Sequence, residues 1–383
     1  MECQSRDGLT VVRPDDCGIN PVRRLFFGFE WFVARRGIVR ALIGRVMMRW
    51  LINGNHGAPG LVVLPAGGFR RAKAEITGWA EYLQTPLVPL PGLAEAASVG
   101  TVAIKDESKR LGLGTPEMLG GAYAVGEIVK AELARRDIAS SATTADLLTR
   151  RYSAELTITC ASEGNLGASV AWGARRVGAA CRIVVPDESE TSRIRSIEAL
   201  GASVCRLGAT YDDSVRAAEA EAARQGWLVV SDTAWPGYTE VPRMMMQGYR
   251  LLVDEALDQW VGAPPTHVLI QAGRGGIAAA VSVHTRVRLG AGVRLFVVGS
   301  ETKSNLLAWQ ELERAAFAHV EIGDAAAGDA VRRLSMEGVG ASPSGAAGAA
   351  GLFAVATDPA ARAALALGHE SRVLLFNTEG SGT

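Results

Sequence analysis

The chain has 383 residues, 48% of them hydrophobic, and its 40 basic and 40 acidic side chains leave no formal net charge. This balance excludes a general nucleic-acid-binding protein, which needs a basic excess to displace counterions from phosphates. Five widely spaced cysteines without a C-x-x-C pair, and five histidines without H-E-x-x-H, favour a protein of the reducing cytoplasm without a metal site.

An N-terminal extension, residues 1–65, precedes the main part of the chain and lacks the charged and apolar regions of a signal peptide. Residues 24–51 predict a basic amphipathic helix, because apolar pairs recur at helical spacing and arginines lie off that stripe. No uncharged run reaches the roughly 18 residues of a membrane-spanning helix. We expect the stripe to pack on its own domain or on a partner subunit in preference to a membrane surface, and residues 53–60 to form a linker.

From about residue 66 onward, short apolar runs that predict β-strands alternate with segments of helical spacing. The strand segments are Val102–Lys105, Leu156–Cys160, Arg182–Val185, Ser203–Leu207, Leu228–Ser231, His267–Gln271, Leu295–Val298 and Val373–Phe376. The helical segments include Ala168–Val177, Ser192–Leu200, Ser214–Gln225 and Gln247–Trp260. This alternation predicts an α/β protein with parallel sheets covered on both faces. Because ligands of such folds bind at the carboxyl ends of strands, the loops that follow strands are the informative ones.

Two loops in the first half of the chain leave a predicted strand and open a helix. Lys105–Tyr123 contains a charged turn and a glycine pair, and Thr159–Gly167 is rich in glycine and small polar residues. The second loop suits a turn that binds a ring or a carboxylate. It also suits an ordinary helix cap, in which Ser162 or Asn165 binds free backbone N–H groups.

A third loop, Gln271–Ile277, is a candidate phosphate-binding turn. Its glycines let the backbone approach an anion, and the helix N-terminus that follows offers free N–H groups. A close-packed turn without a ligand is the alternative. The loop matches neither G-x-G-x-x-G nor a Walker loop, which disfavours a dinucleotide or a nucleoside triphosphate. Arg274 in this loop either adds charge for an anion or points to solvent.

Taken together, these loops resemble the fold type II pyridoxal-phosphate enzymes, and among them the diaminopropionate ammonia-lyases. The similar motifs run in order from about residue 75 to the C-terminus and include K-D-E-S-K-R-x-G-L, L-G-G-A-Y, G-N-x-G, D-T-A-W-P-G-Y-T, Q-A-G and N-T-E-G. The resemblance implies a tryptophan synthase β-like fold of two domains, each with a mainly parallel sheet flanked by helices. The large domain is expected to comprise 66–130 and 246–383, and the small domain 131–245. A homodimer is also implied.

The resemblance further implies where pyridoxal phosphate would bind. It places the cofactor phosphate at Gly273, Arg274, Gly275, Gly276 and Ile277. It places Asn165 beside the oxygen of the cofactor ring, and Thr378 in polar contact with the ring.

The Schiff-base lysine of that family falls at a position that holds Glu117 in this chain, since the flanking motifs align without a gap. A carboxylate cannot form an imine with an aldehyde. Pyridoxal phosphate is therefore not expected as an internal aldimine at position 117, and is either held without a covalent bond or absent. The chain has only five lysines, namely Lys73, Lys105, Lys109, Lys130 and Lys303. None is an obvious substitute, and Lys303, which follows a predicted strand, comes nearest.

Three carboxylates, Glu117, Glu163 and Asp232, are then expected to converge on one pocket. Close carboxylates split their pKa values, which leaves one protonated and one ionised near neutrality. Such a pair suits elimination, cyclisation, hydrolysis or isomerisation of a small amino-acid-like or phosphate-bearing ligand. We favour this interpretation of a repurposed enzyme. A non-catalytic protein that binds a ligand or partner is the first alternative, and lyase chemistry with another lysine is the second.

Overall fold

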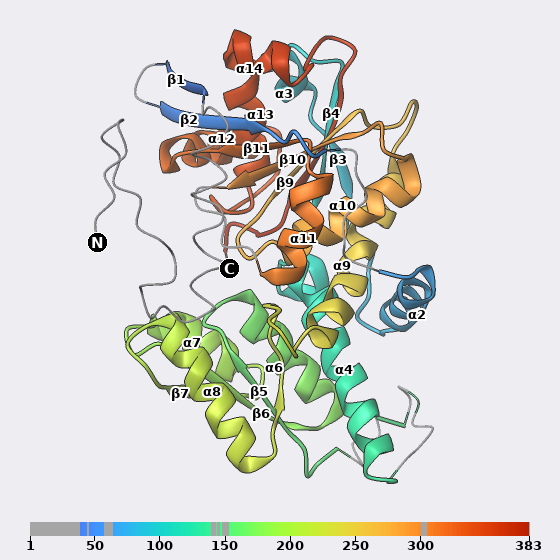
Figure 1. The fold of residues 1–383 in the computed structure, drawn as a ribbon, viewed down its shortest axis with the longest axis vertical. Coiled ribbons are helices and arrows are strands. Elements are labelled where there is room, and N and C mark those ends of the chain that lie inside the picture. Colours follow the sequence, from blue (N-terminus) through green and yellow to red (C-terminus); the bar gives the residue numbers. More distant parts are fainter. Residues whose placement is uncertain are drawn as a thin grey trace, which may run out of the picture. The chain divides into compact units, whose positions relative to one another are not determined.

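The computed structural model describes residues 39–43, 46–56, 64–138, 143, 146–147, 153–299 and 305–382. Residues 41–383 form one compact unit, and residues 1–40 belong to a separate one. Within the described part of the larger unit, the chain builds two β-sheets with helices packed on them (Figure 1).

The larger sheet has eight strands, in the order β1-β2-β11-β10-β9-β12-β4-β3. Their bounds are β1 Val39–Ile43, β2 Val46–Ile52, β11 Ala318–Glu321, β10 Arg294–Gly299, β9 His267–Gln271, β12 Arg372–Asn377, β4 Thr101–Asp106 and β3 Leu87–Pro89. The central strands from β11 to β4 run parallel, whereas β2 pairs with β11 and β3 pairs with β4 in antiparallel fashion. The middle strands are buried, as expected for a parallel sheet covered on both faces.

The smaller sheet has four parallel strands, in the order β7-β6-β5-β8. Their bounds are β7 Ser203–Arg206, β6 Ala180–Val185, β5 Thr157–Ala161 and β8 Leu228–Val229. Each of the eight predicted strand segments overlaps a strand of one of the two sheets. The α/β architecture with two mainly parallel sheets is thus confirmed. The predicted domain limits stay a prediction, and two of them, 130/131 and 245/246, fall inside helices.

The helices cover both faces of the larger sheet and the sides of the smaller one (Figure 1). Their bounds are α2 Ala66–Thr77, α3 Pro91–Ala96, α4 Glu117–Arg135, α6 Asn165–Val177, α7 Thr191–Glu198, α8 Tyr211–Gln225, α9 Glu240–Gln259, α10 Gly276–Leu289, α11 Leu306–Ala315, α12 Asp324–Met336, α13 Ala347–Thr357 and α14 Pro359–Ala364. One apolar core runs from the smaller sheet through α4, α6, α9 and α10 to one face of the larger sheet. A second core covers the other face with α3, α12, α13 and α14. The helices α4 and α9 therefore connect the two sheets through shared apolar packing.

The helix predicted for residues 24–51 is wrong where the structure describes this segment, because β1 and β2 are strands. Strand β2 pairs with β11, with Trp50 opposite Val320. Trp50 is only 9% exposed, whereas the neighbouring Arg49 points to the other side and lies 3.6 Å from Glu321. Tertiary pairing at a sheet edge has overridden the helical spacing. Residues 24–38 lie outside the described residues.

The linker predicted for residues 53–60 begins inside the fold. Asn53 is only 2% exposed, and its side-chain amide donates to the carbonyl oxygens of Glu313 at 2.7 Å and Ala316 at 2.9 Å. These bonds fix the end of β2 against α11. Residues 57–60 lie outside the described part of the chain.

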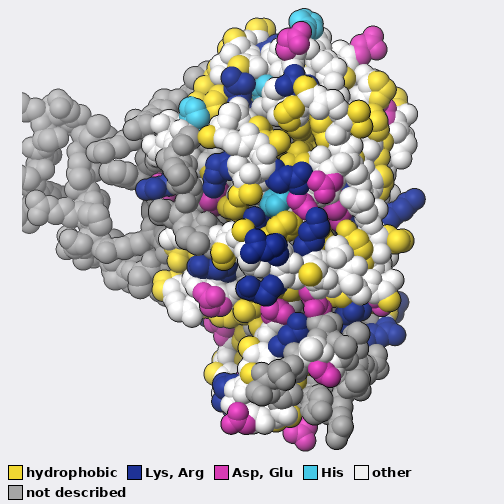
Figure 2. Space-filling view, turned by 90° about the vertical axis from the view of Figure 1, so that its right-hand side faces the viewer, with side chains coloured by type: hydrophobic (Ala, Val, Ile, Leu, Met, Phe, Trp, Pro, Cys, Tyr) yellow, Lys and Arg dark blue, Asp and Glu magenta, His cyan; other side chains and the backbone are white. Residues whose placement is uncertain are grey.

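Surface ion pairs add to the apolar packing around α9. Figure 2 shows Lys and Arg side chains gathered on the side of the protein where α2 lies, with acidic side chains beside them. Lys73 on α2 contacts Asp254 on α9 at 2.6 Å, and Arg288 on α10 contacts Asp258 on α9 at 2.8 Å. Both contacts join neighbouring helices. Among the described residues, no helix is long and apolar enough to cross a membrane.

The crossing of α4 and α9 brings their backbones unusually close. A Cβ atom added at Gly248 would lie 1.8 Å from the backbone oxygen of Leu119. We therefore expect Gly248→Ala to push the helices apart and to lower the free energy of unfolding by about 3 kcal/mol or more. The measurement is denaturant-induced unfolding of the purified protein.

Gly126→Ala on the same helix α4 is the matched control, because no atom lies within 4 Å of its added Cβ. It is expected to stabilise the protein by about 0.5–1 kcal/mol, since alanine favours a helix more than glycine does. Equal effects of the two substitutions would contradict the close crossing.

Candidate functional site

A cavity of about 440 Å³ opens at the carboxyl ends of β9 and β10. The ends of parallel strands are where α/β proteins bind their ligands. Helices α4, α6 and α10 all begin at this cavity, so their N-termini contribute to its wall. The polar and charged side chains that line it are Thr115, Glu117, Ser162, Asn165, Asp232, Tyr249, Gln271, Arg274, Ser344, Thr378 and Glu379.

The glycine-rich turn after β9 is open toward the cavity and ends in a helix N-terminus. Gly273, Gly275, Gly276 and Ile277 line the cavity, and α10 begins at Gly276. Gly275 has a φ of 86°, a left-handed conformation that favours glycine. An added Cβ at Gly273 would meet no atom within 4 Å, so the backbone there is open to a ligand. Free N–H groups at the start of α10 make this turn fit a phosphate or another small anion.

Arg274 leaves this turn toward the smaller sheet and does not extend freely into solvent. Its guanidinium carbon lies 4.0 Å from the ring centre of Tyr211, at the start of α8. Its Nη1 donates to Thr233 Oγ1 at 2.9 Å, and its Nε lies 3.6 Å from Asp232 Oδ1. The alternative in which Arg274 points to solvent is therefore wrong, because a ring and two oxygen atoms hold the side chain at the cavity.

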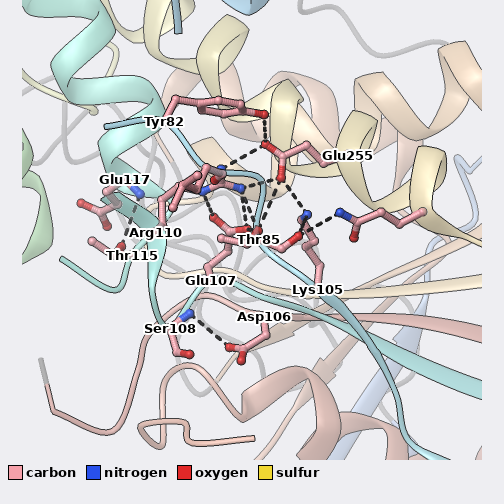
Figure 3. Close-up of polar contacts among 12 residues, drawn as sticks. Tyr82, Thr85, Lys105, Asp106, Glu107, Ser108, Arg110, Thr115, Glu117 and Glu255 are labelled. Atoms are coloured by element: carbon pink, nitrogen blue, oxygen red, sulfur yellow. Dashed lines mark hydrogen bonds and ion pairs between the residues drawn. The ribbon is translucent and has the colours of Figure 1, made fainter. Parts of the chain in front are cut away.

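Glu117 is the first residue of α4, directly after Pro116. Its backbone oxygen accepts a hydrogen bond from Ser169 Oγ at 2.9 Å. Its N–H donates to Thr115 Oγ1 at 3.3 Å (Figure 3). Its side chain is half-buried, and the carboxylate oxygen Oε2 is buried without a hydrogen-bond partner among the described residues. The backbone is thus fixed while the carboxyl group remains available to a ligand.

The surroundings of Glu117 favour its protonated form. Burial is the main cause that raises its pKa from 4.5 to about 8, and the charges of Asp232 and Glu379 raise it further. The positive charge of Arg274 acts in the opposite direction. A pKa of about 8 favours the protonated form of Glu117 at neutral pH.

Asp232 follows β8 and lies in the same cavity. Burial raises its pKa, while Arg274 and a hydrogen bond from Thr233 favour its ionised form. Its backbone oxygen accepts from Asn305 Nδ2 at 2.8 Å, which fixes this turn against the start of α11. Of the three predicted carboxylates, Glu117 and Asp232 line the cavity, whereas Glu163 is half-buried and lies outside the cavity lining.

The opposite wall of the cavity comes from the end of β12 and the start of α6. Asn165 Nδ2 donates to Glu379 Oε1 at 2.8 Å, and Glu379 Oε2 accepts from Ser342 Oγ. Gln271 Nε2 donates to Thr378 Oγ1 at 2.6 Å. The Thr378 hydroxyl then has its proton free for an acceptor such as a ring nitrogen.

Sequence reasoning missed Glu379 and Gln271 as site residues. Both stand in motifs that carried the family resemblance, N-T-E-G and Q-A-G, and that was the available signal. The side-chain oxygen Oε1 of Gln271 is buried without a partner in the described structure, so this wall also retains an acceptor. No group of three His, Cys, Asp or Glu side chains in the described ranges is arranged to hold a metal ion.

None of the four described lysines lines the cavity. Lys73 and Lys130 contact acidic side chains at 2.6 Å and 2.8 Å, and Lys109 is exposed. Lys105 is fully buried and contacts Glu255 Oε2 at 2.7 Å. Lys303 lies outside the described residues.

The charged turn before Glu117 is a buried ion network (Figure 3). Arg110 donates from Nε to Glu107 at 2.6 Å and from Nη2 to Glu255 at 2.8 Å. Lys105 and the hydroxyl of Tyr82 also bind Glu255. Two cations and two anions thus neutralise one another inside the protein, between β4 and α9. The network fixes the chain that leads from β4 to Glu117.

The family follows from comparison with known proteins. A family model of pyridoxal-phosphate dependent enzymes matches residues 79–379. The chain belongs to this family. The match includes the smaller sheet, the larger sheet apart from β1 and β2, and all the residues that line the cavity.

Two curated relatives match parts of the chain. The diaminopropionate ammonia-lyase of Escherichia coli K12 is 41% identical over 204 residues, which cover 53% of this chain and 50% of that protein. A serine dehydratase-like protein of Mus musculus is 33% identical over 125 residues, which cover 33% of this chain and 36% of that protein. The chain therefore spans about half the length of the first of these relatives in sequence.

Solved structures match more of the chain. The apo crystal structure of Escherichia coli diaminopropionate ammonia lyase has a TM-score of 0.79 and 32% identity, with 87% of this chain and 93% of that chain covered. A pyridoxal 5'-phosphate-dependent aspartate racemase, at 16% identity and a TM-score of 0.66, shares the fold. The protein thus has the fold type II architecture and is similar to diaminopropionate ammonia-lyase.

Proposed function

We propose that the protein is an enzyme that moves protons on a small amino-acid-like substrate, with Glu117 as general acid–base and without a lysine-bound cofactor. The observation that carries the proposal is the Glu117 carboxyl group. It lines the cavity, retains a buried oxygen without a partner, and lies in surroundings that raise its pKa to about 8. A carboxyl group with a pKa near the working pH is suited to proton transfer.

Asp232 and Glu117 differ in their charge partners, and this difference supports separate roles. Arg274 lies 3.6 Å from Asp232 and favours its ionised form, so we assign proton acceptance to Asp232. Glu117 holds its proton and can donate it from Oε2 to a group in the cavity. When Asp232 accepts one proton and Glu117 donates one, the net charge of the pair does not change. Elimination, cyclisation and isomerisation all require such an exchange.

The residues present fit part of pyridoxal phosphate. The turn from Gly273 to Ile277 would hold its phosphate, Thr378 would contact its ring, and Asn165 would lie at the ring oxygen. When bound, this cofactor supplies an electron-withdrawing ring that stabilises negative charge next to an amine. The cavity lining contains no lysine among the described residues, and we propose that the cofactor, where it binds, is held without a covalent bond. We infer that Glu117 occupies the position of the family's Schiff-base lysine.

Hydrogen–deuterium exchange tests the proposal without knowledge of the product. The protein is incubated in D2O with a panel of amino acids that includes 2,3-diaminopropionate, and exchange at Cα is followed by proton NMR. We expect the wild type to catalyse exchange on at least one member, and Glu117→Gln to slow it about 100-fold or more. Exchange that is unchanged in Glu117→Gln would remove Glu117 from the mechanism.

The same samples also test the alternative with another lysine. They are mixed with pyridoxal phosphate, reduced with borohydride and analysed by intact-protein mass. We expect no adduct on the wild type and an adduct on Glu117→Lys, the matched positive control. An adduct on a wild-type lysine that is required for exchange would support lysine-dependent chemistry. Binding of amino acids without any exchange would support the non-catalytic alternative.

A further inference from the structure

The cavity has a marked imbalance of charge. Three carboxyl groups line it, on Glu117, Asp232 and Glu379, and Glu117 favours its neutral form, whereas Arg274 is the one cationic side chain among the described lining residues. Glu379 is already held by Asn165 and Ser342. A ligand carboxylate that enters this cavity is repelled by the ionised carboxylates and attracted by Arg274 and by the helix N-termini in the wall.

The contacts of Arg274 leave it able to bind a further anion. Its hydrogen bond to Thr233 uses one of the five N–H donors of a guanidinium. Its 3.6 Å separation from Asp232 is longer than the roughly 2.7–2.9 Å of a charge-assisted hydrogen bond. The ring of Tyr211 supports one face of the guanidinium at 4.0 Å and leaves its edge for planar, bidentate contacts.

Arg274 also lies at the correct side of the cavity for a second anionic group. The turn at Gly273–Ile277 presents backbone N–H groups at the start of α10, whereas the Arg274 side chain extends from that turn toward Asp232 and Thr233. One anion at the helix N-terminus and another at the guanidinium would therefore not compete for the same donors. The carboxylate at the guanidinium would lie beside Asp232, one of the two proposed proton carriers.

We propose that Arg274 is a specificity-determining residue that binds the carboxylate of an amine-bearing substrate. The proposal deepens the function proposed above and rests on the same cavity. It concerns binding, so it is separable from proton transfer by Glu117. In the bound state the substrate carboxylate replaces Asp232 as the main partner of the guanidinium.

A matched pair of ligands tests this proposal. The probes are 2,3-diaminopropionate and its carboxamide, which has the same two amines but no carboxylate, and the measurement is isothermal titration calorimetry. We expect the wild type to bind the acid about tenfold more tightly than the amide, or better, as a charged hydrogen-bonded pair requires. Arg274→Met should abolish this preference while its affinity for the amide falls less than twofold. Arg274→Lys should keep part of the preference, because the charge remains but the bidentate geometry is lost.

Control variants distinguish a loss of carboxylate recognition from a loss of proton transfer or of folding. Arg224→Gln on the surface of α8 is the matched arginine control and should keep the preference, since Arg224 pairs with the neighbouring Glu221 and lies outside the described cavity lining. Glu117→Gln should also keep it, so a failure of the proton-transfer mechanism leaves this result unchanged. Thermal unfolding of each variant verifies that it is folded. A wild type that binds the acid no better than the amide, or binds neither, would overturn the proposal.

Inorganic phosphate tests whether a phosphate binds at the backbone of the Gly273–Ile277 turn or at the Arg274 side chain. Its affinity should be the same in the wild type and in Arg274→Met, because backbone N–H groups of the turn would hold it. Loss of phosphate binding in Arg274→Met, together with an intact preference for the acid, would assign Arg274 to phosphate and contradict our assignment.

Discussion

Glu117→Gln is expected to be more stable than the wild type at high pH and equally stable in acid. Between the ordinary pKa of 4.5 and the folded value of about 8, the folded protein keeps the proton on Glu117 whereas the unfolded chain releases it. The folded state then binds more protons, so the free energy of unfolding of the wild type falls as pH rises through this range. Above about pH 8 the full cost of ionising Glu117 in the folded protein lowers the stability of the wild type, and below about pH 4.5 this cost is absent.

The expected gain at about pH 9 is on the order of 3–4 kcal/mol, because one pKa unit corresponds to about 1.4 kcal/mol and a half-buried carboxylate keeps some solvent. Glutamine keeps the shape of the side chain and cannot ionise. Denaturant unfolding of both proteins at a series of pH values measures the difference. If the free energies of unfolding of the two proteins change with pH in parallel, Glu117 is already ionised in the folded protein at neutral pH.

Glu221→Gln is the matched control for this experiment. Glu221 lies on the surface of α8, where hydrogen bonds from Arg224 and Gln225 lower its pKa. Its replacement is expected to bring no gain in stability at high pH. A gain at position 117 alone would mean that the fold tolerates an unfavourable charge at the cavity, as functional sites commonly do.

Glu255→Ala is expected to lower the free energy of unfolding by about 3–5 kcal/mol, because it leaves two buried cations without their partner. Glu255 is 2% exposed and binds Arg110 at 2.8 Å and Lys105 at 2.7 Å. Arg110 keeps its ion pair with Glu107 and its hydrogen bonds to Leu83 and Thr85. The fully buried Lys105 loses its contact with Glu255 and keeps the hydrogen bond to the backbone oxygen of Thr85. Chemical denaturation at neutral pH measures the loss.

Asp329→Ala provides the comparison for a surface ion pair. Asp329 contacts Arg332 at 2.7 Å and Arg333 at 3.2 Å, and its side chain is 48% exposed. Its removal is expected to change stability by less than about 1 kcal/mol, since solvent screens the pair. A loss at Glu255 as small as that at Asp329 would contradict the buried network of Figure 3.

Local sequence pattern was sufficient for most of the fold. Most of the eight predicted strands are buried on both faces and are therefore apolar along most of their length, a pattern that is visible without tertiary information. The predicted segments at β7 and β8 are only partly buried or exposed. The helix predicted for the N-terminal segment was wrong because tertiary pairing overrode the local pattern. Its apolar pairs fit a helix, but β11 offered an open edge, and pairing with it decided the structure of β2.

The site likewise contains features that the sequence predicted and features that it did not. The glycine turn was predicted from a loop that follows a strand, whereas Glu117 and Asp232 were predicted from the family resemblance. The direction of Arg274 was not, since it depends on Tyr211 and Thr233, which approach from another sheet. The exclusion of Glu163 from the cavity lining likewise depends on how the turn before α6 is oriented, and the one-dimensional pattern contains no signal for that.

The glycine contacts of α4 determine which wall of the cavity can move. Gly120 faces Tyr249 on α9, Gly121 faces Ser169 on α6, and an added Cβ at either glycine would lie within 2.5 Å of those side chains. The helix is therefore clamped on two sides, and the backbone of Glu117 has little freedom to shift when a ligand enters. Arg274 is held by side-chain contacts to Thr233 and Asp232, and not by close packing of its backbone. We therefore expect a ligand to displace the contacts of Arg274 before it shifts the backbone of Glu117.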